Sequence, residues 1–229
     1  MTTSVEDYLK TIYKVQLETQ DLVKTQTLSD QLKITPASVT EMVKKLATKG
    51  LVSYSPYQGV ALTPRGVDEG KKMVRRHRII ELYIHQLLNV PWDQVHDEAE
   101  RLEHAISDSL INRMEEVLGF PEFDPHGDPI PQKDGRMPVH LKEIVLMQCP
   151  VSFRGTVVRI SHDEKGFLSY LDQVGIHIGS VLEVSVQYAF DQSLDVIRES
   201  ESVHLTHFVS QHIWVVPHEE KTSCKKGDL

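Results

Sequence analysis

The apolar residues of this 229-residue chain change their spacing past the middle of the sequence. Up to about residue 118, they recur every three or four positions, as expected for amphipathic helices. From about residue 150 the spacing becomes strand-like in RGTVVRI, SVLEVSVQY, SVHLTHFV and HIWVVP, with GFLSYLDQVGI as a short helix among them. The pattern predicts a mainly α protein with β structure, in which residues 148–218 form a small C-terminal β-barrel of SH3-like type.

The first seventy or so residues predict three helices followed by a two-stranded ribbon. The helices fit VEDYLKTIYKVQLE, TLSDQLKI and PASVTEMVKKLATKG, and LVSYSPYQGVALT fits two strands around a turn at 57–59. This order is typical of a winged helix-turn-helix, here residues 1–72. The third helix would carry short side chains near its start and lysines further on, which suits base edges and phosphates. The residues that we expect to bind DNA are Thr35, Ala37, Ser38, Thr40, Lys44, Lys45, Tyr57 and Gln58.

Charge is divided unequally along the chain. The net charge is −8, yet residues 1–76 hold twelve Lys or Arg against eight Asp or Glu, which gives +4. The remaining residues hold thirteen against twenty-five, which gives −12, and all twelve histidines lie at position 77 or later. The basic region favours double-stranded DNA as a partner over the alternative, a small domain that binds nothing. The acidic, histidine-bearing remainder suits a cationic ligand.

The stretch HDEAERLEH, residues 96–104, is the strongest candidate for a metal site. On a helix that advances about 100° per residue, one arc holds His96, Glu100, Glu103 and His104. An apolar stripe beside that arc would place these side chains at the edge of the core, where a divalent cation supplies the partner that they need. A solvated charged face with two surface histidines is the alternative interpretation.

Two further pairs of ligand-type residues flank this stretch. His77 and Glu81 are four apart on a long helix predicted from TPRGVDEGKKMVRRHRIIELYIHQLL, and are either a hydrogen-bonded core pair or metal ligands. Asp124 and His126 flank Pro125 in a segment rich in Pro, Gly and Asp, which is either a plain linker or a stiff arm that directs both side chains to a site. The helices of residues 73–140 carry more apolar surface than so small a unit can cover, which predicts a homodimer.

Several classes of protein are disfavoured by what the sequence lacks. It has no apolar run of membrane-spanning length and no signal-peptide core. Cys149 and Cys224 have no partners at metal-ligand spacing, so we expect a cytosolic protein with reduced thiols and no zinc finger. We do not expect an enzyme, because H-E-x-x-H, G-x-S-x-G and a Gly-rich phosphate loop are missing. Residues 219–229 are expected to form a disordered tail.

Four separated motifs occur in the order found in one known family. EDYLKTIY near the start, RRHRIIE in the middle, HDEAERLEH and PHGDPIP together resemble the metal-dependent repressors of the diphtheria toxin repressor family. The resemblance covers essentially the whole chain. It implies a winged helix-turn-helix, a helical metal-binding and dimerisation domain, and an SH3-like domain of FeoA type.

Carried over residue by residue, the resemblance implies two metal sites. The primary site is assigned Asp7, His77, Glu100, Glu103 and His104. The secondary site, between the dimerisation and SH3-like domains, is assigned Glu81, Asp124, His126 and Asp163. The Asp163 assignment comes from aligning DEKGFLSYLD by its phenylalanine, and His96 corresponds to an ancillary ligand of the iron-sensing members.

The resemblance is closer to the manganese-responsive branch of the family. Iron-sensing members carry Met and Cys at the positions of Asp7 and Glu100, whereas the carboxylates of this chain are harder ligands that suit Mn²⁺ better. Ligand softness biases metal selectivity without fixing it, so Fe²⁺ is the alternative. Lys10 replaces a Glu with which some manganese regulators build a two-metal primary site, which favours a separate secondary site like the one at Glu81.

The resemblance implies a homodimeric transcriptional repressor that binds operator DNA with Mn²⁺ or Fe²⁺ as corepressor and controls genes for metal uptake or homeostasis. A cation held by Asp7 and by the ligands of HDEAERLEH would fix the angle between the recognition helices. Two other functions are weighed against this one. They are a metal-dependent hydrolase or oxygenase in the helical middle, and a DNA-binding regulator with an organic effector in the SH3-like domain.

Overall fold

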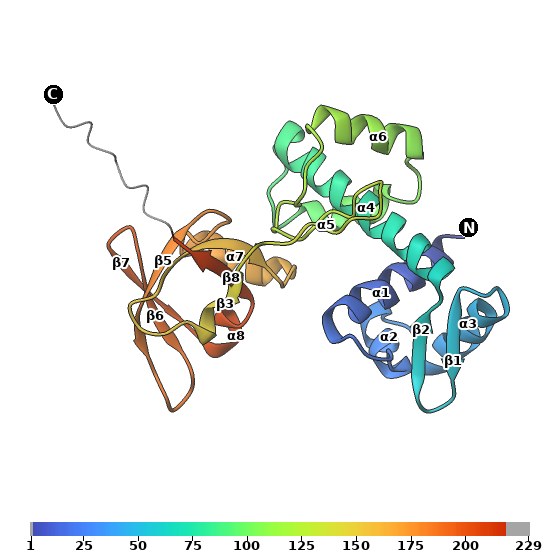
Figure 1. Ribbon diagram of the computed structural model, residues 1–229, viewed down its shortest axis with the longest axis horizontal. Coiled ribbons are helices and arrows are strands. Elements are labelled where there is room, and N and C mark those ends of the chain that lie inside the picture. Colours follow the sequence, from blue (N-terminus) through green and yellow to red (C-terminus); the bar gives the residue numbers. More distant parts are fainter. Residues whose placement is uncertain (1, 219–229) are drawn as a thin grey trace, which may run out of the picture. The chain divides into compact units, whose positions relative to one another are not determined.

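The computed structural model describes residues 2–218, which begin with three helices and a β-ribbon (Figure 1). Helix α1 spans Thr3–Thr19, α2 spans Thr25–Leu32 and α3 spans Pro36–Thr48. Strands β1, Val52–Ser55, and β2, Gly59–Leu62, then pair antiparallel. The predicted winged helix-turn-helix is therefore confirmed.

Local sequence explains where α3 and the ribbon begin. Thr35 caps α3 by accepting a hydrogen bond from the Ser38 N–H at 3.3 Å, and Pro36 takes the first helical position, where its missing N–H costs nothing. Tyr57 turns the chain between β1 and β2 with a φ of 67°. One hydrophobic core joins these elements and includes Leu9, Ile12, Leu28, Val39, Val43, Leu46 and Val60.

Helix α4 connects the winged region to the helices that follow (Figure 1). It spans Pro64–Leu88 and is capped by the Thr63 hydroxyl, which accepts a hydrogen bond from the Gly66 N–H at 3.1 Å. It packs against α1 and also against α6, Asp108–Val117. Along the chain, α5, Val95–Leu102, lies between α4 and α6. A single long helix thus contacts the winged region and the helical region.

The C-terminal part is an antiparallel sheet of six strands, in the order β3-β8-β4-β5-β6-β7. Its strands are β3 (Ile144–Val145), β4 (Arg154–Ile160), β5 (Val181–Gln187), β6 (Leu194–Arg198), β7 (Glu201–Leu205) and β8 (Ile213–Pro217). The helical turns are η1 (Leu146–Gln148), α7 (Lys165–Gln173) and α8 (His207–Ser210). The register shifts within β4 and within β5, and such bulges bend a sheet. The predicted mixed fold, with a small β domain after the helices, is confirmed.

Two details of this domain differ from the sequence expectation. The strand predicted over SVHLTHFV is too long, because β7 ends at Leu205 and the Thr206 hydroxyl caps α8 by accepting from the Val209 N–H at 3.3 Å. Strand β6 was missed, since a carboxylate stands inside LDVIR. That carboxylate, Asp195, accepts hydrogen bonds from the Tyr188 hydroxyl and the His204 Nδ1, each at 2.7 Å.

The described residues group into two compact units. The first comprises the described parts of Met1–Val90, Asp97–Asp124 and Pro129–Pro138. The second comprises Pro91–His96, Pro125–Asp128 and the described part of Val139–Leu229. The domain limits expected from the sequence stay a prediction, and the predicted tail at 219–229 lies outside the described residues. Within residues 2–218, every helix is too short or too polar to span a lipid bilayer.

Candidate metal centre

Three ligand-type side chains of the first unit converge between α1 and the turn that follows α5. Asp7 comes from α1, and Glu103 and His104 come from the turn. Each residue offers one ligand atom, and the three atoms lie within 4.8 Å of one another. The His104 Nε2 atom lies 2.8 Å from Asp7 Oδ1 and 3.4 Å from Glu103 Oε1. We call these three residues the Asp7 cluster.

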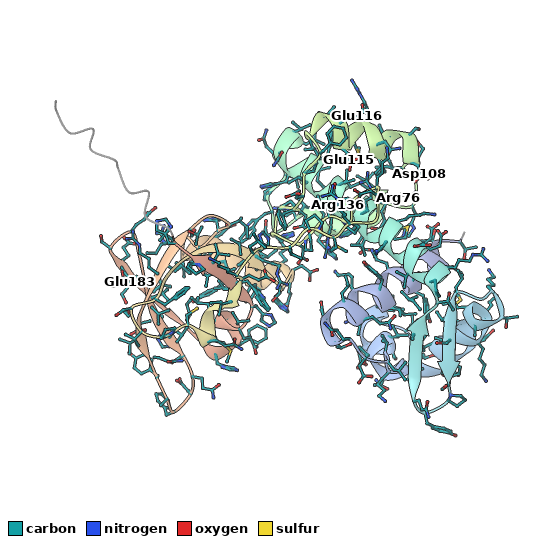
Figure 2. All side chains as sticks on the ribbon, viewed as in Figure 1. Arg76, Asp108, Glu115, Glu116, Arg136 and Glu183 are labelled. Carbon is teal, nitrogen blue, oxygen red and sulfur yellow. The ribbon has the colours of Figure 1, made fainter. Side chains whose placement is uncertain are left out.

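The backbone that carries Glu103 is held by two helices. Its N–H donates to the Ala99 carbonyl at 2.9 Å, so the helical path continues through Glu103 although α5 ends at Leu102. The Arg76 guanidinium of α4 donates to the Glu103 carbonyl at 3.0 Å and also pairs with Asp108 at the start of α6 (Figure 2). The backbone of Glu103 is therefore held in place by hydrogen bonds to two other segments.

Glu6 fixes the orientation of the His104 ring. The Glu6 carboxylate accepts a hydrogen bond from the His104 Nδ1 at 2.7 Å. A ring nitrogen that donates to a carboxylate leaves the other nitrogen, Nε2, directed at Asp7 and Glu103. A lone pair and two carboxylates repel one another unless a proton or a metal cation lies among them. The arrangement is therefore one that a cation stabilises.

Lys10 lies one turn after Asp7 on α1 and adds a positive charge beside the Asp7 cluster. Its ammonium contacts Glu100 Oε1 and lies 2.6 Å from Glu103 Oε1. The Lys10 side chain is 8% exposed and that of Glu103 is 0% exposed, whereas Glu100 is 41% exposed. The predicted ligands Glu100 and Glu103 are thus joined to α1 by a buried ammonium group.

His77 of α4 contacts two carboxylates, one with each ring nitrogen. Its Nδ1 lies 2.6 Å from Glu103 Oε2, and its Nε2 lies 3.0 Å from Glu81 Oε1. Burial alone would lower the pKa of His77, but the charge of Glu81 and the hydrogen bonds to Glu103 and Glu81 outweigh it and raise the pKa to about 9. His77 is therefore positively charged at neutral pH. It contacts Oε2 of Glu103, whereas Lys10 contacts Oε1.

Asp7 and Glu103 differ in how far the protein itself compensates their charge. Burial would raise the pKa of Glu103, but hydrogen bonds and charges from His77 and Lys10 outweigh it and hold that pKa below its usual value. Burial raises the pKa of Asp7, and His104 and Lys10 only partly oppose this, while Glu100 and Glu103 add to it. Two carboxylates and one imidazole form a donor set that fits Mn²⁺, Fe²⁺ or Zn²⁺. The residues present thus fit a divalent cation.

Glu81 and Asp124, which were assigned to the secondary site, lie together in the first unit. Each offers one carboxylate oxygen, and the two oxygens lie within 4.8 Å of each other. The Asp124 Oδ2 atom also lies 3.4 Å from the Arg78 Nε atom, and both side chains are buried. The structure thus brings together two of the four residues assigned to that site within one unit.

His126 and Asp163, the other two, belong to the second unit. The His126 Nε2 donates to the Trp92 carbonyl at 3.0 Å, which leaves Nδ1 as the nitrogen with a lone pair. Asp163 Oδ2 lies 3.7 Å from the Nδ1 of His96, which also belongs to the second unit. The assignment of His96, His126 and Asp163 to metal sites stays a prediction.

The residues expected to bind DNA lie at the surface of α3 and at the tip of the ribbon. Ala37, Ser38, Lys44 and Lys45 are exposed, as are Thr35 and Gln58. Thr40 is half-buried, and its hydroxyl donates to the Pro36 carbonyl at 2.9 Å. The Tyr57 side chain is fully exposed at the turn of the ribbon. Exposure is what DNA contact requires, and the contacts themselves stay a prediction.

Two residues of the centre were missed by sequence reasoning. Glu6 went unassigned, although it immediately precedes Asp7 in the first turn of α1. Lys10 was recognised only as a departure from a two-metal pattern, although it follows Asp7 by three positions and so shares its helix face. That spacing is the signal that could have found Lys10 as a neighbour of the ligands.

Comparison with known families divides the chain into three matched segments. Residues 1–60 match the iron-dependent repressor N-terminal DNA-binding domain, and residues 63–132 match the iron-dependent repressor metal-binding and dimerisation domain. Residues 144–217 match the FeoA domain. The order is the one predicted from the sequence.

Individual relatives extend this likeness. An uncharacterized HTH-type transcriptional regulator of Methanocaldococcus jannaschii is 40% identical over 114 residues, which are 50% of this chain and 91% of that protein. The HTH-type transcriptional regulator MntR of Listeria monocytogenes is 34% identical over 127 residues, 56% of this chain and 87% of the relative.

Solved structures are similar over nearly the whole chain. A manganese-dependent transcriptional repressor in complex with manganese is 40% identical, with a TM-score of 0.86 over 93% of this chain and 100% of the other. The manganese regulator SloR is 30% identical, with a TM-score of 0.77 over 95% of this chain and 100% of the other. The chain therefore belongs to the iron-dependent repressor family of transcriptional regulators, the diphtheria toxin repressor family that its motifs predict.

Proposed function

We propose that this protein is a homodimeric transcriptional repressor that binds double-stranded operator DNA when a divalent cation, Mn²⁺ in the first place, occupies the Asp7 cluster. The regulated genes would be those of metal uptake or homeostasis. Support comes from the family of the chain and from relatives whose names describe manganese-dependent repressors and regulators. The carboxylate-rich donor set favours Mn²⁺ on chemical grounds.

The observation that carries the proposal is the origin of the ligands in the Asp7 cluster. Asp7 lies on α1, which packs into the winged helix-turn-helix, whereas Glu103 and His104 lie in the turn between α5 and α6. A cation held by all three would link the DNA-binding region to the helical region. Such a link is what couples metal binding to the position of a recognition helix.

The residues themselves explain why the link depends on metal. Asp7, Glu103 and Glu100 place carboxylates in one small volume, and Lys10 compensates only part of their charge. Repulsion among the uncompensated carboxylates would loosen α1 from the turn after α5, so that the recognition helix samples many orientations. Binding DNA would then carry an ordering cost that a bound cation has already met, which shifts the population toward the DNA-binding state.

Titration of DNA binding against metal ions tests this function. A duplex would first be selected from a random-sequence double-stranded library in excess Mn²⁺, and its binding would then be followed by fluorescence anisotropy. We expect tight binding with Mn²⁺, loss of binding on addition of EDTA, and recovery when Mn²⁺ is restored in excess. Binding that is equally tight in EDTA would contradict the proposal.

Fe²⁺ and Zn²⁺ are tested in parallel in the same assay. Iron is the second candidate metal because the matched family segments are described as iron-dependent. If Fe²⁺, titrated anaerobically, activates DNA binding at a lower free concentration than Mn²⁺ does, iron and not manganese is the corepressor. The repressor function itself would be unaffected by that result.

A further inference from the structure

Arg76 of α4 contacts both ends of the turn that joins α5 to α6 (Figure 2). Its Nη1 donates to the Glu103 carbonyl at 3.0 Å, and its Nη2 pairs with a carboxylate oxygen of Asp108, the first residue of α6. A single guanidinium therefore spans the turn that carries Glu103 and His104, two ligand-type residues of the Asp7 cluster.

The two contacts suit the ends of the helices that they join. Helix α5 ends at Leu102, and the last carbonyls of a helix lack partners within it and carry a partial negative charge. The Arg76 cation meets that end through the Glu103 carbonyl. Asp108 brings a negative charge to the first turn of α6, where the helix dipole favours it. Arg76 therefore compensates charge at the end of one helix and at the start of the next.

We propose that Arg76 couples the Asp7 cluster to α6. Because it holds the turn at both ends, it directs the Glu103 and His104 side chains toward a bound cation. A bound cation in turn restrains the first turn of α6 through the same guanidinium. Arg76 is thus a positioning residue, which acts on the metal through the ligands. The coupling to metal rests on the proposed function, whereas the hold on the turn does not.

The coupling requires an arginine because the two acceptors belong to different segments. The planar guanidinium offers separate N–H groups in a fixed fork, so Nη1 and Nη2 reach the carbonyl and the carboxylate at once. A lysine ammonium has the same charge but is one point on a flexible stem. The Arg76 side chain is 17% exposed and that of Asp108 is 85% exposed, so the Asp108 contact by itself contributes little to stability. Its role in the proposal is to transmit the position of the turn to α6.

Arg76→Lys tests the effect on the metal centre, because it keeps the charge and removes the fork. Mn²⁺ binding to the full chain is followed by isothermal titration, and the relevant binding step is the one that Asp7→Asn lacks. We expect the affinity of that step to fall by about 10–100-fold, the range found when groups that orient metal ligands are removed. Urea unfolding in EDTA is measured beside it. A lower stability with unchanged Mn²⁺ affinity would show that Arg76 only stabilises the fold and would overturn the proposal.

The hold on the turn is tested without any metal, by amide hydrogen exchange in EDTA. The N–H groups of Ala105 and Ile106 donate to the Leu102 carbonyl at 3.0 and 3.1 Å and so report on the turn. We expect both amides to exchange faster in Arg76→Lys than in the wild type. Unchanged rates would refute the hold on the turn.

The coupling to α6 is tested by the same method with Mn²⁺. The N–H groups of Leu110 and Ile111 donate to the Ser107 carbonyl at 3.0 Å in the first turn of α6. Saturating Mn²⁺ should slow their exchange in the wild type but not in Arg76→Lys, and equal slowing in both proteins would refute the coupling. Asp108→Ala removes only the exposed end of the bridge, and it should abolish the slowing even where Arg76→Lys does not fold.

Arg101→Lys is the matched control, because it makes the same substitution at an exposed position of α5. The Arg101 side chain is 70% exposed and pairs with Glu98 at 2.7 Å. We expect the Mn²⁺ affinity and the amide exchange of this variant to match those of the wild type. Changes as large as those in Arg76→Lys would show that they do not depend on the bridge across the turn, which overturns the proposal. The proposed function fails separately, if Asp7→Asn binds as many Mn²⁺ ions as the wild type.

Discussion

The first unit contains two groups of charged side chains, one buried and one partly buried, that differ in their balance of charge. Arg75 of α4 and Glu115 of α6 form one ion pair at 2.6 Å, with side chains 10% and 3% exposed. The other group gathers Asp7, Glu100 and Glu103 around the single ammonium of Lys10, with protonated His77 behind Glu103. The first group balances one cation with one anion, whereas the second holds more anions than its own cations neutralise.

This difference distinguishes an ion pair that only stabilises the fold from a group of side chains suited to bind a cation. A buried pair of one cation and one anion carries no net charge, and here it joins α4 to α6 without an external ion. A partly buried group with excess carboxylates becomes more stable when an external cation binds, so its stability depends on metal concentration. Burial raises the pKa of Asp7 and nearby Glu100 and Glu103 add to this, so a cation beside the Asp7 carboxylate would favour its charged form.

Asp7→Asn is expected to have the largest effect on function. It removes the charged ligand from α1, so the stimulation of DNA binding by Mn²⁺, of the order of 5–150-fold for typical allosteric coupling, should be lost. Because a poorly compensated carboxylate is removed, the metal-free protein should unfold at the same denaturant concentration or a higher one. Anisotropy and urea unfolding in EDTA measure the two quantities, and a strongly destabilised metal-free protein would show that Asp7 is structural.

Glu115→Ala is expected to give the opposite pattern. It leaves Arg75 buried without its partner and should lower the free energy of unfolding by about 3–5 kcal/mol, while the number of bound Mn²⁺ ions stays that of the wild type. The double variant Arg75→Met, Glu115→Leu should recover most of that loss, because apolar side chains of similar volume replace the pair. A reduced number of bound Mn²⁺ ions in a folded Glu115→Ala protein would contradict the distinction between the two groups.

Glu6→Ala is expected to act through His104. Without the carboxylate on Nδ1, the ring loses its fixed orientation, and Mn²⁺ affinity should fall by about 10–100-fold. Glu6→Gln keeps an acceptor oxygen and should lose less. Isothermal titration with Mn²⁺ measures both, and equal losses in the two variants would show that the charge of Glu6, and not its hydrogen bond, matters.

Arg113→Ala is expected to have the smallest effect. Arg113 pairs with Glu116 on α6 at 2.8 Å, but the two side chains are 72% and 48% exposed (Figure 2 labels Glu116). We expect urea unfolding to change by less than about 0.5 kcal/mol and Mn²⁺ binding to be unaltered. A loss comparable to that of Glu115→Ala would mean that burial does not determine the strength of these pairs.

Much of the fold followed from the sequence because its signals are local. Thr35 and Pro36 mark the start of α3, and the Ser107 hydroxyl caps α6 by accepting from the Leu110 N–H at 3.3 Å. The HDEAERLEH motif likewise predicted that Glu103 and His104 point the same way. Such features depend on residues within one or two turns of one another.

What escaped prediction depends on contacts between distant segments. Lys10 meets Glu100 and Glu103 across 90 and 93 positions, and Glu6 meets His104 across 98. Trp92 falls within residues 73–140, whose sequence predicts helices, but it packs in the core of the second unit and donates to Asp172 at 2.9 Å. Helical periodicity states which face a residue occupies but not which residue lies opposite. Partners of this kind therefore require a structure.

Anomalous diffraction from crystals grown with Mn²⁺ tests the central claim most directly. The account predicts a manganese peak about 2–2.5 Å from a carboxylate oxygen of Asp7, an oxygen of Glu103 and the Nε2 of His104. It also predicts that the Lys10 ammonium remains between Glu100 and Glu103. A manganese peak that lacks Asp7 among its ligands would contradict the claim that the cation links α1 to the turn after α5.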